Sequence, residues 1–152
     1  MDECNEPTLT RMIYFLAQDM RNLAERFLSP HDLTLEQFQT LKVLSITRGV
    51  TQKQLGMTLS KTPGNLTRIL DRLGVKSLIA RQSDPNDRRV CVVFLTDRGQ
   101  VLVDEVTGIF DKFRVQVYEG LSPEMEETTR KTIARMISNM AAMSDALKLM
   151  IK

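Results

Sequence analysis

Two groups of side chains that can bind anions stand in the middle of this 152-residue chain. One is a run of hydroxyl, amide and guanidinium groups from Thr62 to Arg72, and the other is the adjacent pair Arg88 and Arg89. Such groups bind phosphate oxygens and pair with base edges in the grooves of DNA. Residues 51–98 hold nine Lys or Arg and four acidic residues (net +5), whereas twelve and fifteen elsewhere give −3. A charged run is more often a plain solvated surface, but this asymmetry is also expected of a phosphate-binding face.

Helix-capping signals divide the first group between two short helices. Thr51 and Gln54 have the spacing of a capping box, which predicts a helix beginning at Thr51. Thr62 is an N-cap candidate with Pro63 at the first helical position, and together they predict a second helix to about Lys76. One face of this second helix is apolar (Leu66, Ile69, Leu70, Leu73), and the opposite face carries Asn65, Thr67, Arg68, Asp71 and Arg72.

The second group lies on a predicted β-hairpin. Residues 77–79 lead into one strand, and the β-branched run 90–95 is its partner. The turn between them is Asp84-Pro85-Asn86-Asp87, so Arg88 and Arg89 follow it directly. Successive strand residues point in opposite directions, so one arginine can enter a narrow minor groove while the other meets phosphate or Asp87. We expect Arg89 to be the one that enters the groove.

Amphipathic helices flank this region on both sides. Residues 7–28 repeat apolar side chains at gaps of three and four, and a second helix is expected to begin at Thr34 and end near Gly49. Thr96 can cap a long helix, and Ser122-Pro123 opens the last one. The last helix has apolar residues at heptad spacing, namely Ile133, Met136, Met140, Met143, Leu147 and Met150. Such a row packs either against a second chain or within its own chain.

The predicted fold is therefore mainly α with a small β wing: six helices plus a hairpin, in the order of a winged helix-turn-helix. In motif terms the chain resembles the MarR (multiple-antibiotic-resistance regulator) family of transcription factors. The resemblance rests on Thr51-Gln52 with Leu55 and Leu59, Leu66-Thr67-Arg68 with Leu70-Asp71, Leu78-Ile79-x-Arg81, Asp84-Pro85-Asn86-Asp87-Arg88-Arg89, and Leu95-Thr96-x-x-Gly99. Two positions depart from the family pattern. Gly56 replaces an alanine, which should weaken its helix by roughly 1 kcal/mol, and Ser77 replaces the glycine that usually ends the recognition helix.

The resemblance implies one domain over residues 1–152, with a winged helix-turn-helix lobe at 34–98 and dimerisation helices at 7–28 and 99–151. It implies a homodimer that binds double-stranded DNA at palindromic operators. It further implies a transcriptional regulator, in our interpretation a repressor, that a small phenolic or lipophilic anionic effector releases from DNA. Met12, Met20, Met136, Met140 and Met143 could line an effector pocket, although methionines at helical spacing are more often simple core.

Within this frame each polar group receives a role. Thr62, Asn65, Thr67 and Arg68 are assigned to the major groove, and Arg72 is expected to reach phosphate. Asp71 cannot favour DNA directly, so we expect it to hold an arginine in place. The predicted DNA-binding residues are Thr51, Gln52, Lys61, Thr62, Pro63, Asn65, Thr67, Arg68, Arg72, Arg88 and Arg89, with Asp84 and Asp87 shaping the wing turn.

Composition argues against other classes. No apolar run approaches the length of a membrane helix, and the acidic N-terminus is unlike a secretory signal, so a cytoplasmic protein is expected. A single histidine, no glycine-rich phosphate loop and no catalytic carboxylate cluster leave no plausible enzyme site, cofactor or metal site. Two alternatives stay open: a winged-helix module that binds protein instead of DNA, and a regulator that senses oxidation of Cys4 or Cys91. Acidic neighbours of Cys4 and the apolar neighbours of Cys91 favour inert thiols.

Overall fold

The computed structural model describes residues 6–47, 49–83 and 90–150, with side chains described as far as Ser144. The chain forms two compact units, Met1–Lys112 and Phe113–Lys152. In chain order the elements are α1 (Leu9–Leu28), the 3₁₀ helix η1 (Ser29–His31), α2 (Leu35–Ser45), β1 (Val50–Thr51), α3 (Gln52–Thr58), α4 (Pro63–Val75), β2 (Ile79–Ser83), β3 (Cys91–Leu95), α5 (Asp97–Val117) and α6 (Pro123–Met150). Within the described ranges no helix is both long and apolar enough to span a membrane.

The predicted caps set the beginnings of the helices. Thr34 and Thr51 each form a complete capping box, with Gln37 and Gln54 respectively. The hydroxyl of Thr62 accepts the N–H of Asn65 at 3.4 Å and opens α4 as predicted. The last two helices begin at their predicted caps too, since Thr96 and Ser122 accept backbone N–H groups at 3.0 and 3.2 Å. One boundary was wrong: α2 ends at Ser45, earlier than the expected end near Gly49, and Gly49 adopts a φ of +108°.

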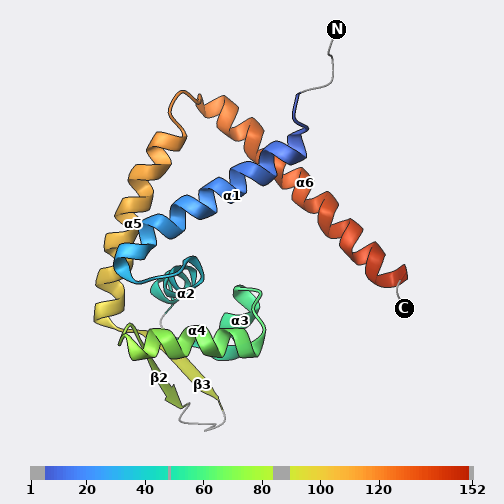
Figure 1. Cartoon of the computed structure of the whole chain (residues 1–152). Coiled ribbons are helices and arrows are strands. Elements are labelled where there is room, and N and C mark those ends of the chain that lie inside the picture. Colours follow the sequence, from blue (N-terminus) through green and yellow to red (C-terminus); the bar gives the residue numbers. More distant parts are fainter. Residues whose placement is uncertain (1–5, 48, 84–89, 151–152) are drawn as a thin grey trace. The chain divides into compact units, whose positions relative to one another are not determined.

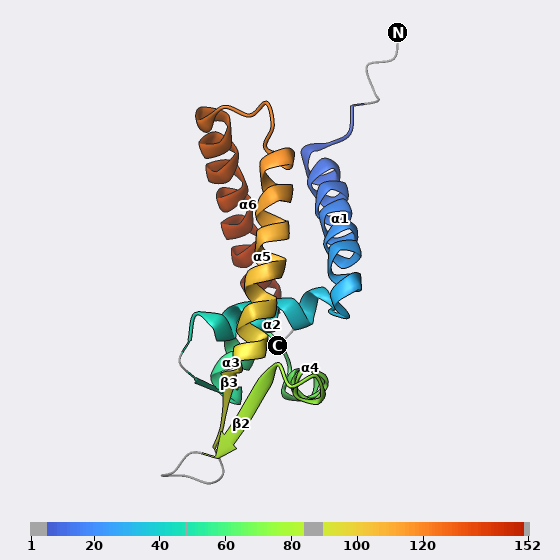
Figure 2. The ribbon, with the colours of Figure 1, turned by 90° about the vertical axis from the view of Figure 1, so that its left-hand side faces the viewer.

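The hairpin strands β2 and β3 (Figures 1 and 2) belong to a three-stranded antiparallel sheet with the order β1-β3-β2. In β2 and β3, Ile79 pairs with Leu95 and Ser83 pairs with Cys91, which confirms the predicted strand pairing. The sequence did not predict β1, where Val50 pairs with Val93. A two-residue strand is too short to show alternation. Because β1 and β2 both pair with β3, the sheet joins the start of α3 to the end of α4.

A single apolar core holds the first unit together. The predicted inner face of α4 is buried, and residues of α1, α2, α3, β2, β3 and the first half of α5 also contribute. Figure 1 shows α2, α3 and α4 grouped on one side of the strands. The fully buried large side chains are Leu28, Leu41, Leu44, Leu55, Leu66, Leu70, Leu73, Val93, Val103 and Val106. Helix α1 takes part at its C-terminal end, through Leu28. The core therefore positions α4 with its polar face outward.

Gly99 lets α5 approach the end of α4 closely. The Leu78 carbonyl oxygen accepts the N–H of Thr96 at 3.1 Å. A Cβ built on Gly99 would lie 2.2 Å from that oxygen, inside van der Waals contact. By contrast, a Cβ on Gly56 would lie 3.4 Å from the Lys61 carbonyl oxygen, an ordinary contact. The Leu95-Thr96-x-x-Gly99 pattern thus marks a packing requirement, whereas Gly56 meets none of this kind.

Ser77 adopts the backbone conformation that a glycine would favour. Its φ is +57°, its N–H donates to the Gly74 carbonyl at 2.9 Å, and the Leu78 N–H donates to the Leu73 carbonyl at 3.1 Å. These two bonds form a Schellman motif. Asp32 and Ser60 end their helices in the same way, with φ of +53° and +51°. The departure from the family pattern at Ser77 therefore leaves the helix-end geometry intact.

Ser77→Gly should raise the free energy of unfolding by about 1 kcal/mol, because glycine adopts positive φ without the steric cost borne by other residues. Urea unfolding would measure the change. Ser138→Gly in the regular helix α6 is the matched control and should lower the free energy of unfolding by about 1 kcal/mol. If both substitutions changed the free energy of unfolding by the same amount and in the same direction, the positive φ of Ser77 would not be the cause of the effect.

Candidate nucleic-acid interface

The outward face of α4 presents three long polar side chains that have no partner among the residues the structure describes. Asn65, Arg68 and Arg72 are all exposed. Within the part of the chain that the structure describes, none of these side chains makes a hydrogen bond or ion pair. They lie three and four residues apart along the helix, so they share one side of it. Two cations and an amide are therefore available to an external ligand.

Thr67, by contrast, is engaged inside the protein. Its hydroxyl donates to the Pro63 carbonyl oxygen at 2.9 Å and accepts the side-chain N–H of Gln52 at 2.8 Å. Both side chains are half-buried. Two residues assigned from sequence to DNA contact are thus bonded to each other, and they connect the first turn of α3 to the first turns of α4.

Asp71 holds an arginine, as the sequence predicted. Nη1 of Arg81 lies 2.7 Å from Oδ1 of Asp71, and Nη2 donates to the Thr67 carbonyl oxygen at 3.5 Å. Arg81 comes from β2, so this ion pair connects the hairpin to the middle of α4. Arg81 belongs to the Leu-Ile-x-Arg motif, but sequence reasoning gave it no role. An acidic residue on an otherwise cationic face was the available signal.

Two lysine ion pairs connect α4 and its surroundings to the rest of the first unit. Lys61, in the α3–α4 turn, pairs with the Glu36 carboxylate of α2. Lys76, at the C-cap of α4, lies 2.9 Å from Oδ2 of Asp32 and also donates to the Asp32 carbonyl oxygen. The structure therefore places the amine of Lys61, which the sequence assigned to DNA, against a carboxylate. Neither pair had a local sequence signal, because the partners are far apart in the chain.

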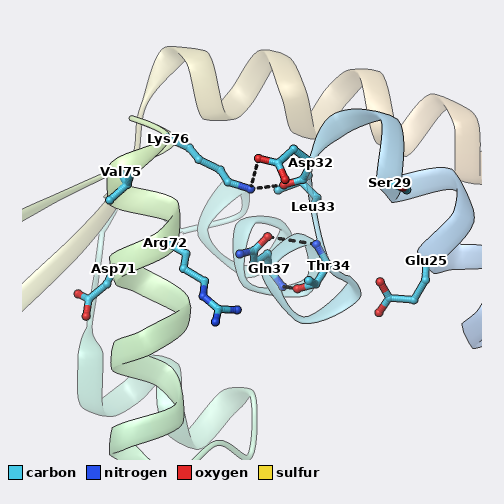
Figure 3. Close-up of a pocket in the computed structure, with 10 residues that line it drawn as sticks. All are labelled: Glu25, Ser29, Asp32, Leu33, Thr34, Gln37, Asp71, Arg72, Val75 and Lys76. Atoms are coloured by element: carbon cyan, nitrogen blue, oxygen red, sulfur yellow. Dashed lines mark hydrogen bonds and ion pairs between the residues drawn. The ribbon is translucent and has the colours of Figure 1, made fainter.

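A cleft of about 740 Å³ lies beside the C-terminal half of α4, between that helix and the end of α1 (Figure 3). In Figure 3 the Arg72 side chain extends toward Gln37 and Thr34, while the Asp71 side chain points away from these two residues. The Lys76–Asp32 pair closes one end. Three carboxylates accompany the two cations, in a lining that comprises Glu25, Ser29, Asp32, Leu33, Thr34, Gln37, Asp71, Arg72, Val75 and Lys76.

The remaining predicted site residues divide into two sets. Thr51, Thr62 and Pro63 lie at the N-termini of α3 and α4, where the threonine hydroxyls serve as caps. The predicted wing residues Asp84, Asp87, Arg88 and Arg89 lie outside the described residues, as does Cys4. Cys91 is a free, half-buried cysteine, so it is less covered than the buried position expected from sequence. The described site is therefore the face of α4, with Arg68 on its outer side.

Comparisons with known proteins agree with this arrangement. Residues 33–91 match the model of the MarR family. The multiple antibiotic resistance protein MarR of Salmonella typhimurium is 38% identical over 97 residues, covering 64% of this chain and 67% of the relative. The Escherichia coli K12 protein of the same name is 36% identical over the same shares of the two chains.

Solved structures extend the similarity to most of the chain. A Staphylococcus aureus MepR–DNA complex aligns with a TM-score of 0.81 at 30% identity, covering 88% of this chain and 99% of that one. A MarR variant from E. coli, complexed with operator DNA, aligns with a TM-score of 0.76 at 29% identity, covering 84% and 92%.

Proposed function

Because this chain belongs to the MarR family of DNA-binding transcription regulators, which are not enzymes, we propose that it represses transcription by binding palindromic operators. The observation that carries the proposal is the exposed set Asn65, Arg68 and Arg72 on the outward face of α4, whose side chains have no partner in the described part of the chain. An arginine and an amide on a helix that enters the major groove can pair with guanine and adenine edges. For the wing, the prediction stays that one arginine, in our expectation Arg89, enters the minor groove and that Arg88 meets phosphate or Asp87.

We propose that the regulator is a homodimer. The N-terminal half of α1 leaves large apolar side chains exposed, including Met12, Phe15 and Leu16. Helix α6 has no buried residue up to Ser144, and Ile133, Ile137, Met140 and Met143 on it are exposed. Apolar surface on this scale is typical of an interface. A two-fold dimer would present its recognition helices roughly 34 Å apart, one DNA turn, which requires a palindromic site.

Selection of duplexes from a random library tests DNA binding directly. The selected sequences should be palindromic, and their affinity should fall steeply with salt because phosphate neutralisation releases counterions. Arg68→Ala should bind the selected duplex about tenfold more weakly or worse while binding a scrambled duplex almost as before, because one base contact contributes about 1–3 kcal/mol. Lys112→Ala, an exposed cation outside the proposed site, is the control. Absence of binding to any duplex at low salt would favour a protein-binding module.

We further propose that an anionic effector binds the cleft beside Arg72. Its volume lies in the range of small-molecule sites, and its walls come from both the end of α1 and the recognition helix. An anion paired with Arg72 would withdraw that cation from DNA phosphate. A hydroxybenzoate should therefore release the selected duplex, and Arg72→Gln should need a higher concentration for release than the control Arg98→Gln. Release by peroxide but by no small anion would favour a cysteine-oxidation sensor.

A further inference from the structure

We infer that Gln52 and Thr67 are positioning residues, which set the angle of the recognition helix on α3 through one hydrogen-bonded chain. The inference rests on the proposed function. It assigns Gln52 and Thr67 the role of orienting the recognition helix, in place of the DNA contacts expected from the sequence. The chain runs from the Gln52 amide to the Thr67 hydroxyl at 2.8 Å, and from there to the Pro63 carbonyl at 2.9 Å.

The donor and acceptor of each hydrogen bond follow from the Pro63 carbonyl, at which the series ends. A carbonyl oxygen only accepts, so Thr67 must donate its single proton to Pro63. The hydroxyl then has no proton left, and Gln52 must present its amide N–H to it. Phosphate oxygens and guanine O6 and N7 are acceptors, so Thr67 cannot bind them while this chain is formed. Both bonds are therefore directional, and the single hydroxyl proton of Thr67 is already used within the protein.

The apolar contacts between α3 and α4 cannot fix the angle between the two helices. Leu55 of α3 and Leu66 of α4 are fully buried in the shared core, but apolar burial depends on area and has little angular preference. A hydrogen bond weakens steeply when its angle departs from linearity. The Gln52–Thr67 bond lies at the N-terminal end of both helices, beside the residues of α4 that would enter the groove. It therefore fixes the rotation of Asn65 and Arg68 relative to the rest of the lobe.

Binding of the duplex selected by the parent protein, and of a scrambled duplex of equal base composition, tests the inference. Gln52→Met and Thr67→Val should each lower the affinity ratio of the two duplexes about tenfold, with the scrambled duplex bound as before. The double variant should be no worse than either single one. Thr67→Ser keeps the hydroxyl and should keep the ratio. Thr58→Val, an exposed threonine of α3 outside the chain of bonds, is the matched control.

Other outcomes would refute the inference that Gln52 and Thr67 act together. An unchanged ratio, or effects of the two substitutions that multiply in the double variant, would show that the residues act separately. Equal weakening toward both duplexes by Gln52→Met alone would make Gln52 a phosphate contact. Thermal unfolding tests the bond without DNA: the shifts in Tm of the two single variants should not add, and additive shifts would refute the coupling. Failure of the parent to bind any duplex would instead refute the proposed function.

Discussion

Gly99→Ala is expected to lower the free energy of unfolding by about 3 kcal/mol, because the added methyl group overpacks a closed site. Its Cβ would lie 2.2 Å from the Leu78 carbonyl oxygen and 2.7 Å from Cδ1 of Leu95. The carbonyl cannot move aside without breaking its bond to the Thr96 N–H. The end of α4, the start of α5 and β3 meet here, so the strain reaches the whole lobe. Urea unfolding followed by circular dichroism measures the loss.

Gly108→Ala is the matched control, because it makes the same substitution in the same helix. A Cβ at Gly108 meets nothing within 4 Å. This variant should be more stable than the parent by about 0.5–1 kcal/mol, the usual gain from replacing a helical glycine. If both variants lost stability equally, the effect would come from helix α5 in general and not from the close approach at Leu78.

Leu16→Asp should convert the dimer to monomers and weaken binding to a palindromic duplex by about 10²–10⁴-fold, the advantage that linking two binding modules confers. Leu16 lies on the exposed apolar face of α1 and is 55% exposed in the single chain. A carboxylate there costs nothing in a monomer, but it would be an unpaired charge inside an apolar interface. Sedimentation gives the mass, and titration of the selected duplex gives the affinity.

Ile46→Asp is the control for charge and exposure, since Ile46 is 82% exposed but lies at the end of α2, outside the segments expected to form the dimer. It should leave the dimer mass unchanged. A Leu16→Asp protein that stays dimeric at micromolar concentration would contradict the proposed use of α1. A variant that loses both the dimer and its helical signal would mean that folding of the chain depends on the interface.

Local signals predicted most of the fold. The capping pairs Thr34–Gln37 and Thr51–Gln54, and the Thr62-Pro63 start of α4, act between neighbours in sequence, so their spacing suffices to place a helix. The role of Asp71 could also be predicted, because an acidic residue on an otherwise cationic helix face needs a cation. Periodicity also identified the buried face of α4, because the spacing of apolar residues is a property of a single helix.

What the sequence could not predict depends on pairs that are distant in the chain. Lys76 and Asp32 are joined across the first unit, and no spacing rule relates them. Lys61 looked free for phosphate until its distant partner Glu36 was located. Thr67 was assigned to the groove from its position on the helix. Its bond to Gln52 could not be predicted, because the bond forms only when α3 and α4 pack together. The two-residue strand β1 exists only because β3 lies beside it.

The central place of β3 also affects how the lobe is made during translation. Strands β1 and β2 flank the two helices in sequence, yet both form their hydrogen bonds with β3, at residues 91–95. Until those residues have left the ribosome, the helix pair has no strand to join its ends. Until then the nascent lobe lacks Val93, the fully buried residue that β3 contributes to the core. Since chains grow at about 5–20 residues per second, the completed helix pair waits at least about one second for its central strand.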